Sequence, residues 1–373
     1  MTPNPIVLGQ PFLPPFDQTV EQLKDLWESR SLTNDGVYVK TLTEALRNHL
    51  GVEHLSLVAN GTLGLLLSLR ALGLKGEVIS TPFTFPATTN ALLWSGLKPV
   101  FVDIDPATFN LDPRHVAAAI TPETSAILAV HCFGRPCNTM ALAQLASTHE
   151  LKLIYDAAHA FGVTVAGKNL LLEGDASVLS FHATKVFHTL EGGAVISSNP
   201  AITATIDQLR NFGFYEGSVE ASLLPGINAK LNEIGALIGL LSLEHMDELH
   251  AKRSSIDRLY RQQLASIDGL ACLPAFDGDN HSYFPILVHE SYPLTILQLR
   301  EQLKRHNIGS RRYFYPPVSS LPPYRDLPSA HPGNLPVACD IAERILCLPI
   351  HAELSKADVL RITGLLRAFA CHG

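Results

Sequence analysis

One lysine, Lys185, lies in a stretch that could present a reactive side chain to a ligand, SVLSFHATKVFHTLEGGAVISS. An apolar run from Ser177 to Phe181 leads into a polar turn with His182, and a second apolar run starts at Ala194 after two glycines. A lysine amine is a nucleophile only when it is neutral, and burial beside apolar side chains lowers its pKa toward that state. The two interpretations of Lys185 are therefore a Schiff-base lysine and a solvated lysine at a loop edge.

A second stretch, LSLVANGTLGLLLSLRALGL, has the pattern of a phosphate-binding turn. A short apolar strand is predicted to end at Asn60, Gly61 and Thr62, where an almost wholly apolar helix begins. Free backbone N–H groups at the start of such a helix bind phosphate with the help of the helix dipole and a hydroxyl. The alternative is ordinary capping of this helix by Thr62.

The elements that must position these residues alternate along the chain. Six apolar segments are predicted strands, at residues 77–80, 99–103, 126–131, 152–155, 177–181 and 194–197. Helical segments separate most of them, which is typical of a largely parallel sheet covered on both faces. Residues 232–250 are predicted to form one long buried helix. In such sheets ligands bind beyond the carboxyl ends of the strands.

The predicted strand ends bring polar and aromatic residues to one edge of the sheet. Asp156 follows one strand in DAAHAFG, with His159 three residues further on, and Phe85 follows another in TPFTFPAT. Ser180 and Lys185 follow the central strand. Taken singly, Asp156 could be a helix cap and Phe85 a core residue.

Together these residues are the parts that pyridoxal phosphate (PLP) requires. A lysine binds the cofactor carbon, a carboxylate keeps the pyridine nitrogen protonated, an aromatic ring stacks on the pyridine, and a turn holds the phosphate. We therefore predict a PLP site at this edge of the sheet.

Composition and charge exclude several classes of protein. A chain of 373 residues with 46% hydrophobic content can form two domains with a sizeable core. The net charge of −7 and the lack of any Lys/Arg-rich run argue against nucleic-acid binding. Six cysteines without CxxC spacing indicate neither a metal site nor a disulfide framework and suit a reducing compartment. Because neither a signal peptide nor a membrane-spanning run is recognisable, we predict a cytoplasmic protein.

The sequence resembles the DegT/DnrJ/EryC1/StrS nucleotide-sugar aminotransferases, within the fold-type I PLP enzymes, over essentially its whole length. SFHATKVFHTLEGGA and DAAHAFG are the most specific motifs of this likeness. QPFLPP, LTNDG, RRYFYPP and CLPI look like the branch that makes dTDP-4-amino-4,6-dideoxyglucose. The resemblance implies an α/β fold with a mainly parallel seven-stranded sheet in a large domain, residues 1–245, and a smaller C-terminal α/β domain, residues 246–373.

The resemblance also implies roles for individual residues. Lys185 would be the Schiff-base lysine and later the proton shuttle, Asp156 would pair with the pyridine nitrogen, and His159 would approach the ring oxygen. Further cofactor contacts would be Gly61, Thr62, Phe85, Ser180 and Asn228, the last of them reaching over from the partner in a homodimer with shared active sites. Predicted substrate contacts are Thr33, Asn34, His182, His188, Arg312 and Tyr313. The alternatives are a plain turn at residues 33–35 and solvent-exposed loop arginines.

The implied reaction transfers the amino group of L-glutamate to dTDP-4-keto-6-deoxy-D-glucose, in deoxyamino-sugar and O-antigen polysaccharide biosynthesis. Lysine at position 185 favours transamination over the sugar dehydration of a related branch, which has histidine there. His188 and His351 depart from the asparagine and tyrosine of close relatives, which puts the details of the sugar pocket in question. The alternatives are a 3-keto-sugar aminotransferase, a PLP enzyme of another reaction type, and a non-catalytic regulatory protein on this scaffold.

Overall fold

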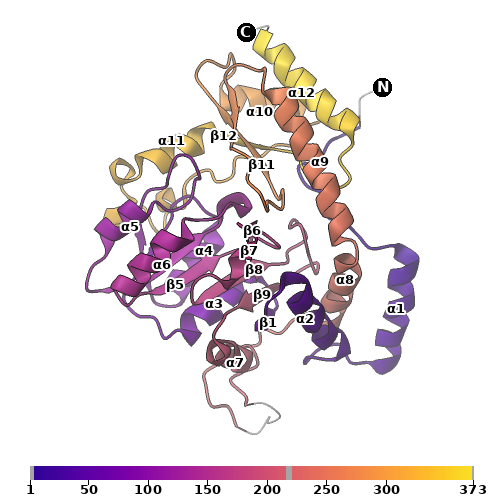
Figure 1. Ribbon diagram of the computed structural model, residues 1–373, viewed down its shortest axis with the longest axis vertical. Coiled ribbons are helices and arrows are strands. Elements are labelled where there is room, and N and C mark those ends of the chain that lie inside the picture. The colour runs from indigo at the N-terminus through magenta and orange to yellow at the C-terminus, as the bar shows by residue number, and fades with distance from the viewer. Residues whose placement is uncertain (1–3, 216–220, 372–373) are drawn as a thin grey trace.

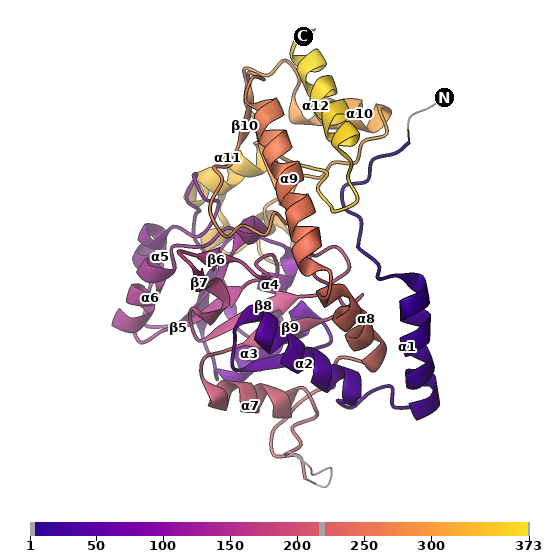
Figure 2. The same cartoon turned by 45° about the vertical axis from the view of Figure 1, so that its right-hand side comes forward.

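The chain folds into two lobes, as a computed structural model of residues 4–215 and 221–371 shows. The large lobe is built around one sheet, and the small lobe lies above it in Figure 1, with helix α9 (Met246–Leu264) running along its side. The N-terminal segment descends from the small lobe to helix α1 (Phe16–Ser29), which stands at the edge of the molecule (Figure 2). The predicted domain boundary at residue 245 lies in the short break before α9.

The large sheet has seven strands in the order β1-β9-β8-β5-β4-β2-β3. They are β1 (Leu55–Val58), β2 (Glu77–Ser80), β3 (Lys98–Phe101), β4 (Thr124–Val130), β5 (Lys152–Asp156), β8 (Ala176–Ser180) and β9 (Gly193–Ile196). Strands β8, β5, β4, β2 and β3 pair in parallel, whereas β9 pairs antiparallel with both of its neighbours. The predicted α/β fold with a mainly parallel sheet is confirmed, and the six predicted strands agree to within two residues.

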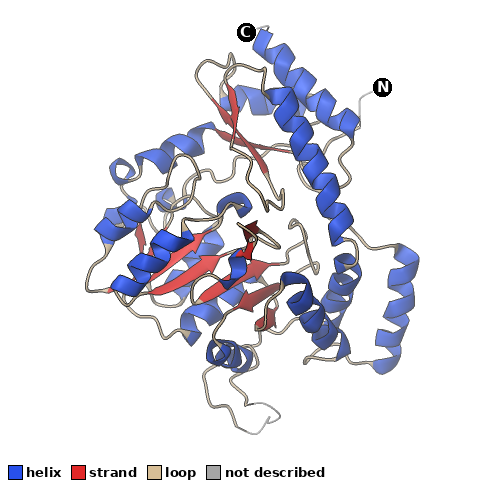
Figure 3. Ribbon diagram, in the orientation of Figure 1, coloured by secondary structure: helices blue, strands red, loops and turns tan. Residues whose placement is uncertain are grey.

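Helices cover both faces of this sheet (Figure 3). They are α2 (Val37–Leu50), α3 (Gly61–Ala71), α4 (Pro86–Trp94), α5 (Pro113–Ala119), α6 (Thr139–Thr148), α7 (Pro200–Leu209) and α8 (Glu233–Leu243). Ile154 and Val178 pack toward α3, α4 and α7. Their neighbours in the same strands face the other way, Leu153 toward α5 and α6 and Leu179 toward α2 and α8. Because successive strand residues alternate between two buried faces, the residues in the middle of these strands are apolar on both sides.

The small lobe has its own antiparallel sheet and core. Its strands are β10 (Leu270–Cys272), β11 (Phe284–Val288) and β12 (Ile345–Leu348), and its other helices are α10 (Ile296–Arg305), α11 (Pro336–Arg344) and α12 (Lys356–Cys371). A short hairpin, β6 (Thr164–Val165) and β7 (Lys168–Asn169), completes the described strands. Ile6 joins the small-lobe core and pairs with Ile308, so the N-terminal segment packs on this lobe. Within residues 4–215 and 221–371, no helix is long and apolar enough to cross a membrane.

The single helix predicted for residues 232–250 is wrong. Helix α8 ends at Leu243 and α9 begins at Met246, with His245 outside helical geometry (φ −103°, ψ 0°). The residues of α8 are buried nearly all round against α2 and the sheet, whereas α9 is amphipathic and packs on α12. A break between them lets each helix bury its own apolar face.

A buried carboxylate fixes the turn that leads into α2. Glu233, which is 1% exposed, accepts hydrogen bonds from the backbone N–H groups of Tyr38 (2.8 Å) and Val39 (3.3 Å). Gly36 leaves the necessary space, because a Cβ there would lie 2.7 Å from the Glu233 carboxyl carbon. An anionic acceptor at this position satisfies unpaired N–H groups and complements the helix dipole.

We expect Glu233→Ala to lower the free energy of unfolding by about 1–3 kcal/mol, because two buried N–H groups lose their acceptor. Urea denaturation followed by circular dichroism measures this effect as a lower midpoint. Glu21→Ala, on the exposed side of α1, is the matched control and should change stability by less than about 0.5 kcal/mol. Equal midpoints for Glu233→Ala and the unaltered protein would contradict this account of α2.

Candidate active site

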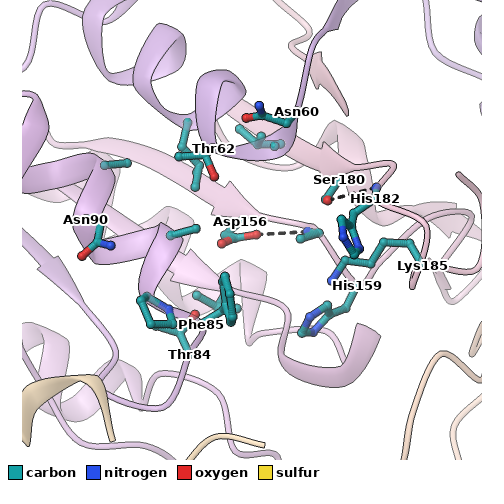
Figure 4. Close-up of a pocket in the computed structure, with 18 of the residues that line it drawn as sticks. Asn60, Thr62, Thr84, Phe85, Asn90, Asp156, His159, Ser180, His182 and Lys185 are labelled. Atoms are coloured by element: carbon teal, nitrogen blue, oxygen red, sulfur yellow. Dashed lines mark hydrogen bonds between the residues drawn. The ribbon is translucent and has the colours of Figure 1, made fainter. Parts of the chain in front are cut away.

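A cavity of about 950 Å³ opens at the carboxyl ends of β5 and β8, where the large lobe meets residues of the small lobe. This is the edge at which a parallel sheet of this kind binds ligands. Nine predicted site residues line the cavity: Gly61, Thr62, Phe85, Asp156, His159, Ser180, His182, Lys185 and Tyr313. Figure 4 shows most of them around a common space. The structure therefore brings most of the predicted cofactor site together.

Backbone hydrogen bonds and two aromatic side chains stabilise the turn that carries Lys185. Phe181 donates its N–H to Gly192 O (2.8 Å) and accepts one from Thr189 (3.0 Å), which closes the loop between β8 and β9. The Phe181 and Phe187 rings are buried and meet edge to face at 4.9 Å. Because both rings anchor the loop in the core, Lys185 is presented from a rigid turn.

Burial controls the charge of the Lys185 amine. Desolvation lowers its pKa from 10.5 to about 8, although the negative charge of Asp156 acts in the opposite direction. The amine is therefore half neutral near pH 8, which makes it a better nucleophile and base than a solvated lysine. Lys185 is half-buried, so it is not a fully solvated loop lysine.

Asp156 ends β5 with its carboxylate buried beside the cavity. It accepts hydrogen bonds from the Thr88 hydroxyl (2.7 Å) and from the Ala158 N–H (3.1 Å; Figure 4). Burial raises its pKa, and these two bonds and the Lys185 charge oppose that rise. Within the described residues, Asp156 and Lys185 interact through their charges and form no ion pair in direct contact. An anion and a cation thus face one cavity and leave room for a ligand between them.

His159 is a neutral hydrogen-bond donor at the cavity wall. Its Nδ1 accepts the Phe133 N–H at 3.1 Å, so the proton of the neutral imidazole lies on Nε2. Burial lowers the pKa of His159 well below its usual value, and the nearby Lys185 charge adds to this. The ring stacks parallel to Phe314 at 6.0 Å and tilts against Tyr283 at 4.6 Å.

The predicted phosphate turn is capped by Asn60 rather than by Thr62. The Asn60 side chain accepts the Leu63 N–H at 2.9 Å, while the Thr62 side chain is exposed to the cavity. The N–H groups of Gly61 and Thr62 have no acceptor within the helix because they belong to its first turn. A Cβ on Gly61 would lie 3.1 Å from the Ser180 Cβ, so the glycine lets this turn sit close to β8.

Phe85 immediately precedes α4 and is not a core residue. Its side chain is 52% exposed, and it lines the cavity together with Thr84 and Asn90 (Figure 4). Phe85 has an extended backbone conformation just before α4, and Pro86 begins the helix, so the position of the ring at this edge is fixed by the start of the helix. An exposed aromatic face beside a buried carboxylate is available for stacking.

The structure places Arg312 outside the cavity, contrary to its predicted substrate contact. Its guanidinium is buried against α11, where it donates to Glu343 Oε2 (2.8 Å) and Ala342 O (3.0 Å) and lies over the Tyr315 ring. The neighbouring Arg311 lines the cavity instead and stacks over Tyr313 at 4.5 Å. Consecutive residues of an extended segment point in opposite directions, so only one of the two arginines can face the ligand.

Other predicted contacts also lie away from this cavity. His188 is buried, and its Nε2 hydrogen-bonds Phe12 O at 2.7 Å, so it binds the N-terminal segment. Thr33 and Asn34 lie in the exposed turn between α1 and α2. Asn228 is exposed and pairs with Asn211 in an isolated bridge. In this chain, none of these four residues lines the cavity described above.

Sequence reasoning missed several cavity residues. Thr88, which donates to Asp156, lies one helical turn after Phe85, so its spacing in TPFTFPAT could have identified it. Tyr283 precedes the apolar strand β11 and looks like a core residue in the sequence. Asn90 and Trp94 lie on α4 and carry no motif of their own.

A model of the DegT/DnrJ/EryC1/StrS aminotransferase family matches residues 17–367. The chain belongs to this family. A dTDP-4-amino-4,6-dideoxy-D-glucose transaminase from Shigella dysenteriae is 47% identical over 96% of both chains. A protein of the same name from Escherichia coli is 43% identical and covers 98% of this chain and 99% of its own length.

Solved structures agree with this membership of the DegT/DnrJ/EryC1/StrS aminotransferase family. DesI, crystallised in the presence of its TDP-sugar product, superposes with a TM-score of 0.93 at 39% identity and covers 100% of this chain and 94% of its own. Helicobacter pylori PseC, an aminotransferase of pseudaminic acid biosynthesis, superposes with a TM-score of 0.92 at 27% identity over 99% of this chain and 100% of its own. The predicted fold class and family are both confirmed.

We expect Asp156→Asn to lower the pKa of Lys185 below about 8, because the Asp156 charge stabilises the protonated amine. The measurement is the pH dependence of Lys185 acetylation in cofactor-free protein, followed by mass spectrometry. Glu191→Gln removes a carboxylate at the cavity rim whose side chain is 65% exposed, so solvent screening should leave the Lys185 pKa unchanged. A higher or unchanged Lys185 pKa in Asp156→Asn would disprove the coupling.

Proposed function

We propose that this chain is a PLP-dependent aminotransferase that converts dTDP-4-keto-6-deoxy-D-glucose and L-glutamate to dTDP-4-amino-4,6-dideoxy-D-glucose and 2-oxoglutarate. The observation that carries the proposal is the cavity in which the Lys185 amine, with its lowered pKa, faces the Asp156 carboxylate without contacting it. The names of the relatives that are 47% and 43% identical support the sugar substrate. We assign it to the cytoplasm because its six cysteines are all free thiols.

The residues of the cavity fit PLP. The first-turn N–H groups of α3 and the hydroxyls of Thr62 and Ser180 suit a phosphate, and the exposed face of Phe85 suits an aromatic ring. Among the residues that the structure describes, no cation contacts the buried Asp156 carboxylate, which suits a protonated ring nitrogen. His159 presents an N–H donor to an anionic ring oxygen. Bound PLP supplies the electron sink that stabilises a carbanion next to nitrogen.

Lys185 performs the proton transfers in this proposal. Its neutral amine takes a proton from the α-carbon of glutamate and, in the second half of the cycle, gives one to the sugar carbon that receives the nitrogen. A pKa of about 8 leaves both protonation states populated near neutral pH, as a group that alternates between acid and base requires. Asp156 would keep the ring nitrogen of bound PLP protonated, because its negative charge stabilises a positive charge beside it.

Arg311 is the proposed anchor for an anionic group of the substrates. It lines the cavity, and its planar fork of donors matches a carboxylate or a phosphate.

The order of substrates and products follows from the single cavity. Because glutamate and the nucleotide sugar react in turn at the same Lys185, the first product leaves before the second substrate reacts. The kinetics should therefore be ping-pong.

A homodimer with shared active sites completes the proposal, with Asn228 of the partner subunit near the phosphate. Two features support it. Asn228 is exposed and lies between α7 and α8, where Phe212, Leu223 and Ile227 are exposed as well. The cavity rim carries Trp94, which is 84% exposed. Apolar side chains exposed at a site rim and on a loop are typical of surfaces that bind another protein.

The first prediction of this proposal concerns the two half-reactions. With PLP bound, L-glutamate should abolish the visible absorbance of the cofactor, and dTDP-4-keto-6-deoxy-D-glucose should restore it, with the amine found at C4 of the product by NMR. An amine at C3 would favour the 3-keto-sugar aminotransferase. Absorbance that glutamate abolishes but this sugar does not restore would exclude the substrate, and no visible absorbance with PLP would favour the regulatory scaffold.

Lys185→Ala should reduce turnover by about a thousandfold or more, because both proton transfers lose their base. Its circular dichroism spectrum should match that of the unaltered protein, since Phe181 and Phe187 anchor the turn that carries Lys185. Steady-state release of 2-oxoglutarate measures turnover. A rate near that of the unaltered protein would refute the assignment of Lys185.

Subunit complementation tests the shared site. Asn228→Ala and Lys185→Ala, each of low activity alone, should recover about a quarter of the activity when co-expressed, because half of the dimers are mixed and each mixed dimer has one intact site. Coupled assay of the purified mixture measures the recovery. The control is co-expression of Lys185→Ala with Asp156→Asn. It should recover less activity, because one chain supplies both of these residues to each site. Equal recovery by the two pairs would refute the contribution of Asn228 by the partner subunit.

A further inference from the structure

The hydroxyl of Tyr283 is the hydrogen-bond acceptor that the structure gives to the Lys185 amine. Lys185 Nζ donates to Tyr283 Oη at 3.4 Å, and Nζ lies 5.9 Å from the centre of the Tyr283 ring. Tyr283 lines the same cavity but belongs to the small lobe, directly before β11. The reactive lysine of the large lobe is therefore contacted by a side chain of the other lobe.

The segment that carries Tyr283 is hydrogen-bonded to the large lobe. The Asn280 side chain donates to His159 O (2.8 Å) and Phe161 O (3.0 Å), and the Ser282 hydroxyl donates to Phe133 O (3.2 Å). Gly134 makes this approach possible, since a Cβ there would lie 2.9 Å from the Asn280 oxygen. Residues 280–283 thus hold a fixed position relative to the active-site loops of the large lobe.

The Tyr283 ring is also packed on several sides. It lies 4.6 Å from the His159 ring, 5.5 Å from Phe133 and 5.4 Å from Tyr313, measured between ring centres. Burial raises the pKa of Tyr283 far above its usual value, so the hydroxyl stays neutral. A neutral hydroxyl accepts from an ammonium group and donates to a neutral amine. Asp156, by contrast, favours only the charged form of Lys185.

We propose that Tyr283 is a positioning residue for Lys185, whose hydroxyl holds the free amine in one orientation in both of its protonation states. The inference rests on the proposed function, in which Lys185 must move a proton twice per cycle. A flexible lysine side chain loses considerable rotamer freedom when it is held in place. A fixed partner therefore raises the rate of proton transfer rather than the affinity for either substrate.

Tyr283→Phe tests the proposal because it removes the hydroxyl and keeps the ring. In cofactor-free protein, the pKa of Lys185 should fall by about 0.5–1 unit, since the ammonium form loses an acceptor. Acetylation of Lys185 against pH, followed by mass spectrometry, measures this shift. With PLP bound, kcat should fall about tenfold or more, while KM for glutamate changes less than about twofold.

Tyr260→Phe is the matched control. It removes a buried hydroxyl for which the described residues provide no hydrogen-bond partner, from a ring that stacks on Phe284 in the same lobe. It should leave both the Lys185 pKa and kcat unchanged. Replacement of Tyr283 by 3-fluorotyrosine, which keeps the shape but is a weaker acceptor, should shift the Lys185 pKa in the same direction by a smaller amount.

Two results would overturn the inference: an unchanged Lys185 pKa in Tyr283→Phe and in the 3-fluorotyrosine protein, or an unchanged kcat in Tyr283→Phe despite a shifted pKa. The labelling experiment needs neither PLP nor sugar. Failure of the unaltered protein to transaminate would therefore refute the proposed function and still leave the hydrogen bond open to its own test.

Discussion

The burial of the Lys185 amine opposite the Asp156 carboxylate is the constraint on which the rest of the structure depends. Desolvation lowers the lysine pKa to about 8 and raises that of the aspartate, and each charge opposes the shift of the other. Neither pKa shift would persist in contact with bulk water, because solvation restores the ordinary pKa values of both groups. The strand ends must therefore be covered, and the residues of the small lobe at the cavity provide that cover. The two-lobed architecture is in this sense a requirement of the chemistry.

Much of the site could be predicted because apolar runs in the sequence show where the strands of the sheet end. Asp156 and Lys185 follow apolar runs, and in a parallel sheet such ends meet at one edge. The sequence could not tell which of Arg311 and Arg312 faces the cavity, since the surrounding segment has no alternation of apolar and polar residues. Tyr283 could not be recognised, because Lys185 is 98 residues away along the chain. Its neighbours in the sequence are those of a core strand.

The departures from the family pattern affect the scaffold in this structure. His188, expected beside the sugar, hydrogen-bonds Phe12 O of the N-terminal segment. His351 is also buried, at 4% exposure, and follows Ile350, whose N–H donates to Leu8 O (3.2 Å) of the same segment. Both histidines thus lie along the path by which residues 6–12 run from the small lobe to the large one. A residue that differs within a catalytic motif can serve to hold the lobes together.

Among the several places that join the lobes are two segments already described: the N-terminal segment and residues 280–283. The second lies closer to the chemistry, because Asn280 and Tyr283 bind the His159 loop and Lys185 respectively. A shift of the small lobe would therefore change both the solvation of Lys185 and its hydrogen-bond acceptor. Desolvation is the main cause of the lowered lysine pKa. The charge state of the Lys185 amine therefore depends on the relative position of the lobes. Interactions far from the cavity that stabilise the lobe contact consequently act on the reactivity of Lys185.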